Sequence, residues 1–246
     1  MSYNIYQRDF HLDCFLLDNE GKANLVTYFN LMQEIALKHA GMLGFGFNDM
    51  VKNNMLWVLT RMVLKIDVEL SWDETVTIKT WSRGIDGPFS FREFLFFNSK
   101  NQEIGKASSS WVPIDLTTRK PTKIFDESPI NRIAVKESVG IDVEKVILPK
   151  DLELGFVHQV HNTDLDINNH ANNARYVEWI YNSMPLGSIK AKNGFIFHIN
   201  YLGEAKLSDH VEIQRSKIDT NQKEFYFNGI NQKSSKSFFT AFLNIN

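Results

Sequence analysis

A chain of 246 residues in which 43% are hydrophobic and 23% are charged has ordinary globular composition, which excludes wholesale disorder and a fibrous chain. The 27 Lys and Arg residues balance 29 Asp and Glu residues to a net charge of -2, so the broad basic surface that nonspecific nucleic-acid binding needs is missing. No stretch approaches the roughly 18 apolar residues of a membrane span, and residues 1–13 lack the apolar run of a secretory signal. We therefore expect a soluble, cytoplasmic protein.

Two further features of the composition concern the interior. Cys14 has no partner for an internal disulfide, and we expect it to be a small buried hydrophobic residue. Phenylalanine is abundant, with 19 residues, which indicates either many β-strands or a cavity large enough for a lipid.

The first half of the chain predicts one helix followed by several strands. Apolar residues recur at three- and four-residue steps from Asn24 to His39, as in a helix with one buried face, and Gly41 is its expected end. Alternating apolar and polar residues then predict strands at 58–68, 75–81, 89–97 and 105–112. The gaps between these strands are too short for a crossover helix, so the sheet should be largely antiparallel.

The second half repeats this order after a connector. Residues 119–150 mix charged residues and prolines with few patterned apolar positions. A helix is then predicted from Asn172 to Met184, before Pro185, and strands at 194–201, 210–217, 224–230 and 237–245. We predict an α+β protein of two units, 1–130 with a connector to about 150, and 151–246.

Short matches between the halves indicate a duplicated unit. Residues 18–28 match residues 166–176 at an offset of 148, with Asp, Ala, Asn and Tyr in common, and the segment at Glu69 matches the segment at Glu204 at an offset of 135. The polar residues are not equally shared. Only the second half carries Asp, Asn and His together, as Asp166, Asn168 and His170.

These three residues occupy alternate positions just before the second predicted helix. In an extended segment their side chains would point the same way. The helix start adds free N–H groups and the positive end of a dipole, which favour developing negative charge and a neutral imidazole on His170. Two interpretations remain open: a reactive site, or an N-terminal cap in which Asn and Asp satisfy the first backbone N–H groups.

The segment from Thr163 to Trp179, which contains these residues, resembles the active-site segment of the acyl-acyl carrier protein (acyl-ACP) thioesterases. Segments 21–25, 31–36, 111–119 and 201–204 are also similar to that family, so the resemblance spans nearly the whole chain. It implies two tandem hotdog units, each a long helix wrapped by an antiparallel sheet. The first unit would shape the acyl pocket without catalysing, and the second would catalyse.

The resemblance also implies a reaction and a catalytic set. The reaction is hydrolysis of a fatty acyl-ACP thioester without cofactor or metal, and the set is Asp166, Asn168, His170 and Glu204. We expect Glu204 and His170 to polarise a water and Asp166 to act as a base or transient nucleophile, although the two carboxylates could exchange roles. Asn168 would orient the network. Ala205 stands where many plant members have a cysteine, so a thiol is not required there.

Further expectations concern the substrate and the oxyanion. Backbone N–H groups near Asn172 are expected to stabilise the oxyanion. Residues expected to line an acyl pocket, with ordinary core as the alternative, are Phe29, Met32, Trp57, Met62, Phe89 and Phe91. A plain alternative for Glu204 is a charged residue at a strand end. His158 and His161 fall on opposite faces of a strand and lack further ligands, so we expect no metal site.

The implied partner is an acyl carrier protein bearing a fatty acyl-phosphopantetheine. Carrier proteins are acidic as a family, so Arg119, Lys120 and Lys123 are predicted to bind it, with a merely solvated connector as the alternative. Two other functions stay open: an acyl-coenzyme A thioesterase and a noncatalytic fatty-acyl binding protein. The oligomeric state is also open, with a homodimer as one alternative.

Overall fold

The computed structural model describes residues 4–125, 128–185, 194–218 and 222–245. The chain forms two compact units, unit 1 (Met1–Val143) and unit 2 (Glu144–Asn246), and the boundary between them lies inside the predicted connector. No helix within the described ranges has both the length and the apolar character needed to cross a membrane.

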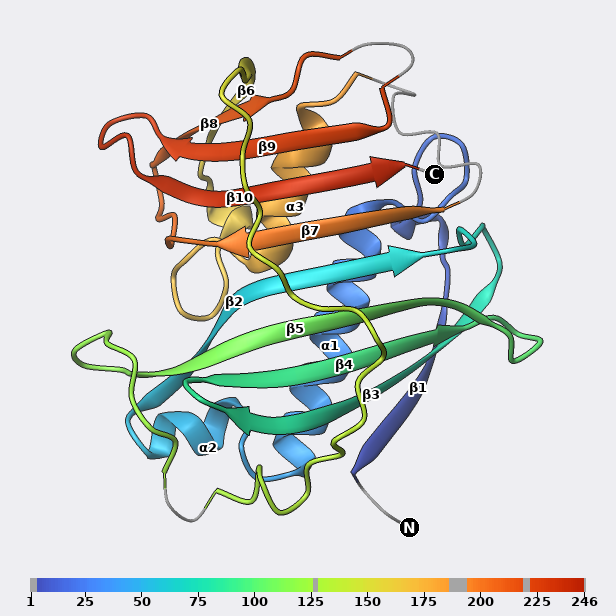
Figure 1. Cartoon of the computed structure of the whole chain (residues 1–246), viewed down its shortest axis with the longest axis vertical. Coiled ribbons are helices and arrows are strands. Elements are labelled where there is room, and N and C mark those ends of the chain that lie inside the picture. The colour runs from blue at the N-terminus through green and yellow to red at the C-terminus, as the bar shows by residue number, and fades with distance from the viewer. Residues whose placement is uncertain (1–3, 126–127, 186–193, 219–221, 246) are drawn as a thin grey trace. The chain divides into compact units, whose positions relative to one another are not determined.

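Unit 1 is a long helix lying against one face of an antiparallel sheet (Figure 1). Its elements are β1 (Ile5–His11), the 3-10 turn η1 (Cys14–Leu16), α1 (Leu25–Met42), α2 (Phe47–Lys52), β2 (Met55–Ile66), β3 (Thr75–Asp86), β4 (Phe89–Phe97) and β5 (Glu103–Asp115). Neighbouring strands pair in the order β1-β3-β4-β5-β2. The predicted antiparallel arrangement is confirmed.

The helix α1 forms where the apolar period predicts it. The Asn24 side chain caps its start by accepting a hydrogen bond from Thr27 N at 3.0 Å. Met32 and Ile35 on its inner face are fully buried. Gly41 does not end the helix, which continues to Met42, because a glycine inside a helix costs only about 1 kcal/mol relative to alanine.

Unit 2 repeats this architecture with a shorter helix (Figure 1). Its elements are β6 (Glu153–Gln159), the 3-10 turn η2 (Asn162–Asp164), α3 (Asn173–Asn182), β7 (Phe195–Tyr201), β8 (His210–Arg215), β9 (Glu224–Asn231) and β10 (Ser237–Ile245). Neighbouring strands pair antiparallel in the order β6-β8-β9-β10-β7, which is the order of unit 1. The duplication predicted from the sequence therefore extends to the strand topology.

The interior of each unit is rich in phenylalanine on the strands. Phe94 and Phe96 of β4 are buried in unit 1, and Phe225 and Phe227 of β9 are buried in unit 2. Cys14, by contrast, is exposed, so the prediction of a buried cysteine is wrong. It lies in the surface turn η1, where the neighbouring Phe15 is also exposed.

Residues 131–143 of the predicted connector form a strap across the sheet of unit 1. The strap is held by backbone and side-chain contacts. Val135 N donates to Ser82 O at 2.9 Å, and Val139 N donates to Glu93 Oε2 at 3.2 Å. The connector is therefore not a free linker over this stretch.

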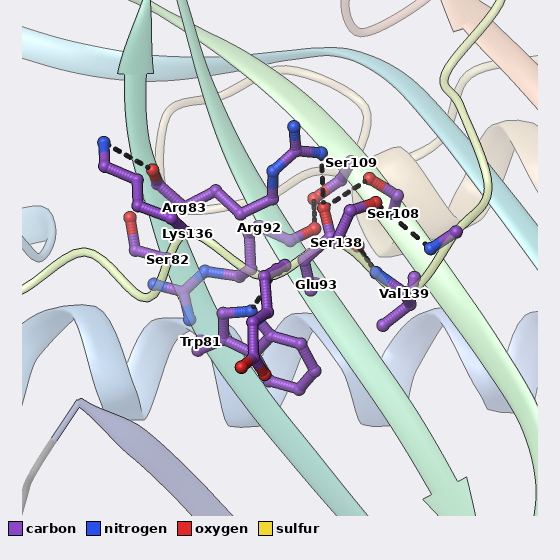
Figure 2. A network of polar contacts seen from close by, with 12 residues as sticks. Trp81, Ser82, Arg83, Arg92, Glu93, Ser108, Ser109, Lys136, Ser138 and Val139 are labelled. Atoms are coloured by element: carbon purple, nitrogen blue, oxygen red, sulfur yellow. Dashed lines mark hydrogen bonds and ion pairs between the residues drawn. The ribbon is translucent and has the colours of Figure 1, made fainter.

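Glu93 is the buried carboxylate at the centre of the strap's attachment (Figure 2). Its side chain is fully buried, and Oε1 accepts hydrogen bonds from Arg83 Nη1 and Ser108 Oγ, both at 3.0 Å. Burial raises the pKa of Glu93, while the hydrogen bonds from Arg83, Val139 and Ser108 act in the opposite direction. The strap, β3 and β5 thus meet on one side chain of β4.

Candidate active site

The chain that leads into α3 makes a tight turn, so the predicted extended alignment of Asp166, Asn168 and His170 is wrong. Leu165 and Ala171 bridge the two ends of the turn. Asp166 Oδ1 accepts hydrogen bonds from Asn168 N at 2.7 Å and from His170 N at 3.3 Å. An aspartate can bond the amides that follow it in this way, which stabilises a turn in place of a strand.

Unit 1 builds the same turn from different side chains. Asp18 Oδ1 accepts hydrogen bonds from Glu20 N and Lys22 N, both at 2.9 Å. Because an aspartate closes the turn in both units, the aspartate itself does not distinguish them. What distinguishes unit 2 is the pair of side chains that follows, with His170 at the position of Lys22.

His170 and Glu204 come together at the surface of unit 2. His170 Nε2 lies 3.5 Å from Glu204 Oε2. The side chain of His170 is 18% exposed and that of Glu204 is 39% exposed, so the pair is partly shielded but remains open to a substrate. Glu204 follows the end of β7, and the family resemblance groups it with the residues of the turn although it is distant in sequence.

Tyr176 on α3 fixes the segment that carries Glu204. Its hydroxyl accepts a hydrogen bond from Ala205 N at 2.8 Å and donates one to Gly203 O at 3.3 Å. These are the residues on either side of Glu204. Burial raises the pKa of Tyr176, the bond from Ala205 opposes the shift, and the charge of Glu204 adds to it, so the hydroxyl stays protonated.

Sequence reasoning used Tyr176 only as a mark of the repeat and did not assign it a place in the site. The matching Tyr28 in unit 1 makes the equivalent contact, because its hydroxyl accepts from Leu70 N at 3.2 Å. A tyrosine retained at the same position in both halves is the signal that could have found it. The contact is part of the shared scaffold, and unit 2 uses it beside Glu204.

Asn172 caps α3, as the alternative interpretation proposed. Its Oδ1 accepts a hydrogen bond from Ala174 N at 2.9 Å, and its own N–H donates to Asp164 O at 2.8 Å. The N–H of Asn172 itself is therefore occupied, so an oxyanion donor at the start of α3 would have to be another of its first N–H groups. The Asn168 side chain supplies another donor on the same turn as His170, and its Nδ2 donates to Asp166 Oδ2 at 3.3 Å.

A second polar pair lies at the base of the turn. His158 Nε2 of β6 lies 2.8 Å from Asp164 Oδ2, and the same oxygen accepts a hydrogen bond from His161 N at 2.7 Å. Burial opposes ionisation of Asp164, but the bonds from His161 and His158 outweigh it and lower its pKa. Within the described ranges, no group of His, Cys, Asp and Glu side chains is arranged to hold a metal ion.

The residues predicted to line an acyl pocket divide into two groups. Phe29, Met32 and Met62 are buried inside unit 1. Trp57, Phe89 and Phe91 are half-buried, and Trp57 donates from Nε1 to Phe45 O at 2.9 Å. The burial of the first three fits ordinary core as well as a pocket wall.

The three predicted partner-binding residues follow β5 in unit 1. Arg119, Lys120 and Lys123 are all exposed. Three positively charged residues of this segment are therefore at the surface, which is the minimum that the prediction requires.

A shallow depression of about 360 Å³ lies beside the turn of unit 2. Its lining consists of residues 159–163 together with Leu207 and Ser208, so it is formed by the segments that flank the turn and follow Glu204. None of the four predicted catalytic residues lines it. The candidate site rests on the side-chain contacts of His170 and Glu204 and not on this hollow.

Comparisons with known proteins agree with the two-unit architecture. Residues 3–130 match the acyl-ACP thioesterase N-terminal domain, and residues 135–241 match the acyl-ACP thioesterase C-terminal domain. A chloroplastic palmitoyl-acyl carrier protein thioesterase of Gossypium hirsutum is 28% identical over 242 residues, which cover 88% of this chain and 56% of the relative. One from Arabidopsis thaliana is 30% identical over 197 residues, which cover 74% and 48%. The chain spans about half the length of these curated relatives.

Solved structures share the fold over the full chain. An acyl-ACP thioesterase from Bacteroides thetaiotaomicron aligns with a TM-score of 0.89 at 24% identity and covers 100% of both chains. The 12:0-ACP thioesterase from Umbellularia californica aligns with a TM-score of 0.83 at 21% identity and covers 98% of this chain and 93% of that one. The predicted α+β tandem hotdog fold is confirmed. Because the two family matches together span most of its length, the chain belongs to the acyl-ACP thioesterase family.

Proposed function

We propose that this protein hydrolyses the thioester of a fatty acyl-ACP and releases a free fatty acid, which ends synthesis on that carrier. The observation that carries the proposal is the contact of His170 with Glu204, 3.5 Å apart beside a turn that unit 1 builds with a lysine in place of the histidine. Family membership supports the reaction. The relatives' names, which include palmitoyl-, oleoyl- and dodecanoyl-carrier thioesterases, support a fatty acyl substrate.

In the proposed mechanism His170 and Glu204 hold the attacking water between them. The water loses a proton to Glu204 as its oxygen adds to the thioester carbonyl carbon. The tetrahedral intermediate then collapses, the C–S bond breaks, and the leaving thiolate of the phosphopantetheine takes the proton from Glu204. The products are a fatty acid and a free thiol, so atoms and charge balance without a cofactor.

The negative charge on the carbonyl oxygen needs hydrogen-bond donors. We assign Asn168 Nδ2 to this role, because the amide sits on the same turn as His170 and its neighbour Asp166 holds it at 3.3 Å. The N-terminus of α3 adds the positive end of a helix dipole. Asp166 then acts by shaping the turn and orienting Asn168, since two backbone amides already occupy its Oδ1.

The proposal divides the labour between the units. Unit 2 would carry the chemistry, and unit 1 would hold the acyl chain among Phe29, Met32 and Met62, whose burial provides an apolar environment. Arg119, Lys120 and Lys123 would attract the acidic carrier protein. A cytoplasmic location, which the single cysteine favours, belongs to the same proposal, although the plant relatives are named chloroplastic.

The test is a measurement of fatty acid release from matched palmitoyl-ACP and palmitoyl-coenzyme A. The proposal expects a larger kcat/KM for the carrier-bound substrate. Equal or greater efficiency with coenzyme A would favour the acyl-coenzyme A alternative. Tight binding of the acyl chain with no release from either thioester would make the protein a noncatalytic binder and remove the proposed function.

A further inference from the structure

The pair of His158 and Asp164 lies outside the proposed catalytic set. It nevertheless holds both ends of the turn that carries three members of the set, Asp166, Asn168 and His170. At the entry, Asp164 Oδ2 accepts from His161 N at 2.7 Å and contacts His158 Nε2 at 2.8 Å. At the exit, Asp164 O accepts from Asn172 N at 2.8 Å. One residue therefore fastens β6, the start of the turn and the N-terminus of α3.

His158 extends this attachment to the middle of α3. Its ring stacks on Trp179, with 4.8 Å between ring centroids and an angle of 30° between ring planes. Trp179 is fully buried, so the stack anchors His158 to the interior of unit 2. The histidine links the turn, through Asp164, to the helix that also carries Tyr176.

Unit 1 shows what the fold requires at the position of His158. Phe10 of β1 pairs with Val76 of β3, and His158 of β6 pairs with Val211 of β8. His158 follows Phe10 by 148 residues and Val211 follows Val76 by 135 residues, which are the two offsets of the repeat. Phe10 and His158 are therefore equivalent. Unit 1, which lacks the Asn and His of the proposed catalytic set, therefore has an apolar ring at the position of His158.

The position of Asp164 is apolar in unit 1 as well. Leu16 N donates to Asp13 O at 3.0 Å, and Asp164 N donates to His161 O at the same distance. The 3-10 turn thus closes in the same way around a leucine, although the Leu16 carbonyl accepts from Thr27 Oγ1 and not from a backbone N–H. Unit 1 therefore folds with Phe10 and Leu16 at these positions, whereas unit 2 carries a histidine and a carboxylate whose side chain is only 6% exposed.

A buried carboxylate loses its hydration and needs hydrogen bonds in its place, and Asp164 finds them at His161 N and His158. At this position of the repeat, only the unit with the proposed catalytic side chains carries such a carboxylate. We propose that His158 and Asp164 are positioning residues, which clamp the turn so that His170 stays within reach of Glu204. This inference rests on the proposed thioesterase function, and it assigns the pair no contact with substrate.

The test transplants the unit 1 pair into unit 2. The double variant His158→Phe/Asp164→Leu should keep the wild-type urea midpoint, because Phe10 and Leu16 support the same turn. Its kcat on palmitoyl-ACP should fall about 10- to 100-fold, the scale of a misplaced reacting group, with KM unchanged. Asp164→Asn, which keeps the acceptor for His161 N, should retain most of kcat.

Hydrogen exchange supplies a readout that does not depend on activity. The amides of residues 165–171 should exchange faster in the double variant than in the wild type, while amides of β9 and β10 should not change. Glu153→Gln is the matched control, because it removes another ion pair of β6, with Arg215 Nη1 at 2.8 Å, away from the turn. It should alter neither kcat nor exchange in the turn.

Three results would overturn the inference. These are a double variant with wild-type kcat and wild-type exchange, a control that loses as much kcat as the double variant, or a double variant that does not fold, since the pair would then be needed for folding. If the wild type cleaves no thioester, the proposed function fails, and the exchange of residues 165–171 still decides whether the pair clamps the turn.

Discussion

The carboxylates of Asp18 and Asp166 accept hydrogen bonds from backbone amides at the same spacing, two and four residues further along the chain. Unit 1 has this aspartate and the same hydrogen bonds but no histidine at the position of His170. The aspartate is therefore accounted for by its role in forming the turn. Asn168 and His170 have no such explanation, because Glu20 and Lys22 occupy their positions in unit 1. At the scale of single residues, the difference between the copies therefore separates scaffold from chemistry.

Asp166→Asn tests whether the carboxylate is needed as a base. Asparagine keeps an acceptor oxygen for the amides of Asn168 and His170 but cannot take a proton. The change also removes the Oδ2 acceptor that orients Asn168, so we expect kcat to fall about 10-fold, below the 100- to 10,000-fold scale of a lost general base. Steady-state kinetics on palmitoyl-ACP provide the measurement. A loss near the upper end of that scale would return Asp166 to the role of base or nucleophile.

Tyr176→Phe tests the support behind Glu204. The change leaves Ala205 N buried without its acceptor, which should lower the free energy of unfolding by about 1 to 3 kcal/mol. It should also lower kcat, because the segment holding Glu204 loosens. Tyr28→Phe is the control, since it removes the equivalent bond from Leu70 N and should reduce stability without reducing kcat. Equal effects on kcat in both variants would contradict this role.

At the scale of elements, the sequence predicts the strands with strong alternation. The bounds of β4 and β10 agree with the prediction, because both strands have one buried face. The sequence does not predict β1 and β6, whose residues alternate between half-buried and exposed along much of their length. Edge strands carry little apolar patterning, so their pairing depends on neighbours distant in sequence.

In the candidate site too, the sequence identifies single residues but not the contacts between residues of separate elements. The difference between the repeats identifies Asn168 and His170 from residue types alone, whereas Glu204, which unit 1 matches with Glu69, is implied only by the family resemblance. It does not identify the hydrogen bond of Tyr176 to Ala205 N or the contact of His158 with Asp164, since both join separate elements. Nor does it predict that Asn172 N is occupied by Asp164 O. Contacts that need the assembled unit are not visible in the pattern.

The buried Glu93 beneath the strap of unit 1 should make the stability of the protein depend on pH. The pKa of Glu93 is raised above its ordinary value of 4.5, so the folded state binds this proton more tightly than the unfolded chain. Stability from this group is then greatest below about pH 4.5 and falls as the pH rises through the folded pKa. Urea unfolding between about pH 4.5 and 7 should show this slope in the wild type and a smaller slope in Glu93→Gln, where Glu69, whose pKa burial also raises, still contributes.

The exposed Glu137, on the same strap, provides the control for this measurement. Glu137→Gln should leave the pH slope of the wild type unchanged. A slope in Glu93→Gln as steep as in the wild type would mean that other groups are responsible and that Glu93 does not contribute to this pH dependence.

At the scale of the whole molecule, two units with one topology carry different side chains at equivalent positions. The net charge of -2 excludes a broad attraction to acidic partners, so binding of an acidic carrier must depend on a local patch. Replacing Arg119, Lys120 and Lys123 with glutamate should raise KM for palmitoyl-ACP about 10-fold or more and leave KM for palmitoyl-coenzyme A nearly unchanged.

The matched control for this charge reversal is Lys223→Glu/Lys233→Glu/Lys236→Glu, at three exposed positions of unit 2. It changes net charge in the same direction without altering the patch. A KM for palmitoyl-ACP that rises equally in both variants would show that total charge, and not the patch, governs carrier binding.

The most direct test of the account compares Glu204→Gln with Glu69→Gln, the same substitution at equivalent positions of the two units. Fatty acid release from palmitoyl-ACP should fall about 100- to 10,000-fold in Glu204→Gln, as expected for loss of a positioned base, and remain near the wild-type rate in Glu69→Gln. Near-wild-type release by Glu204→Gln, or an equal loss in both variants, would contradict the claim that only the second unit cleaves the thioester.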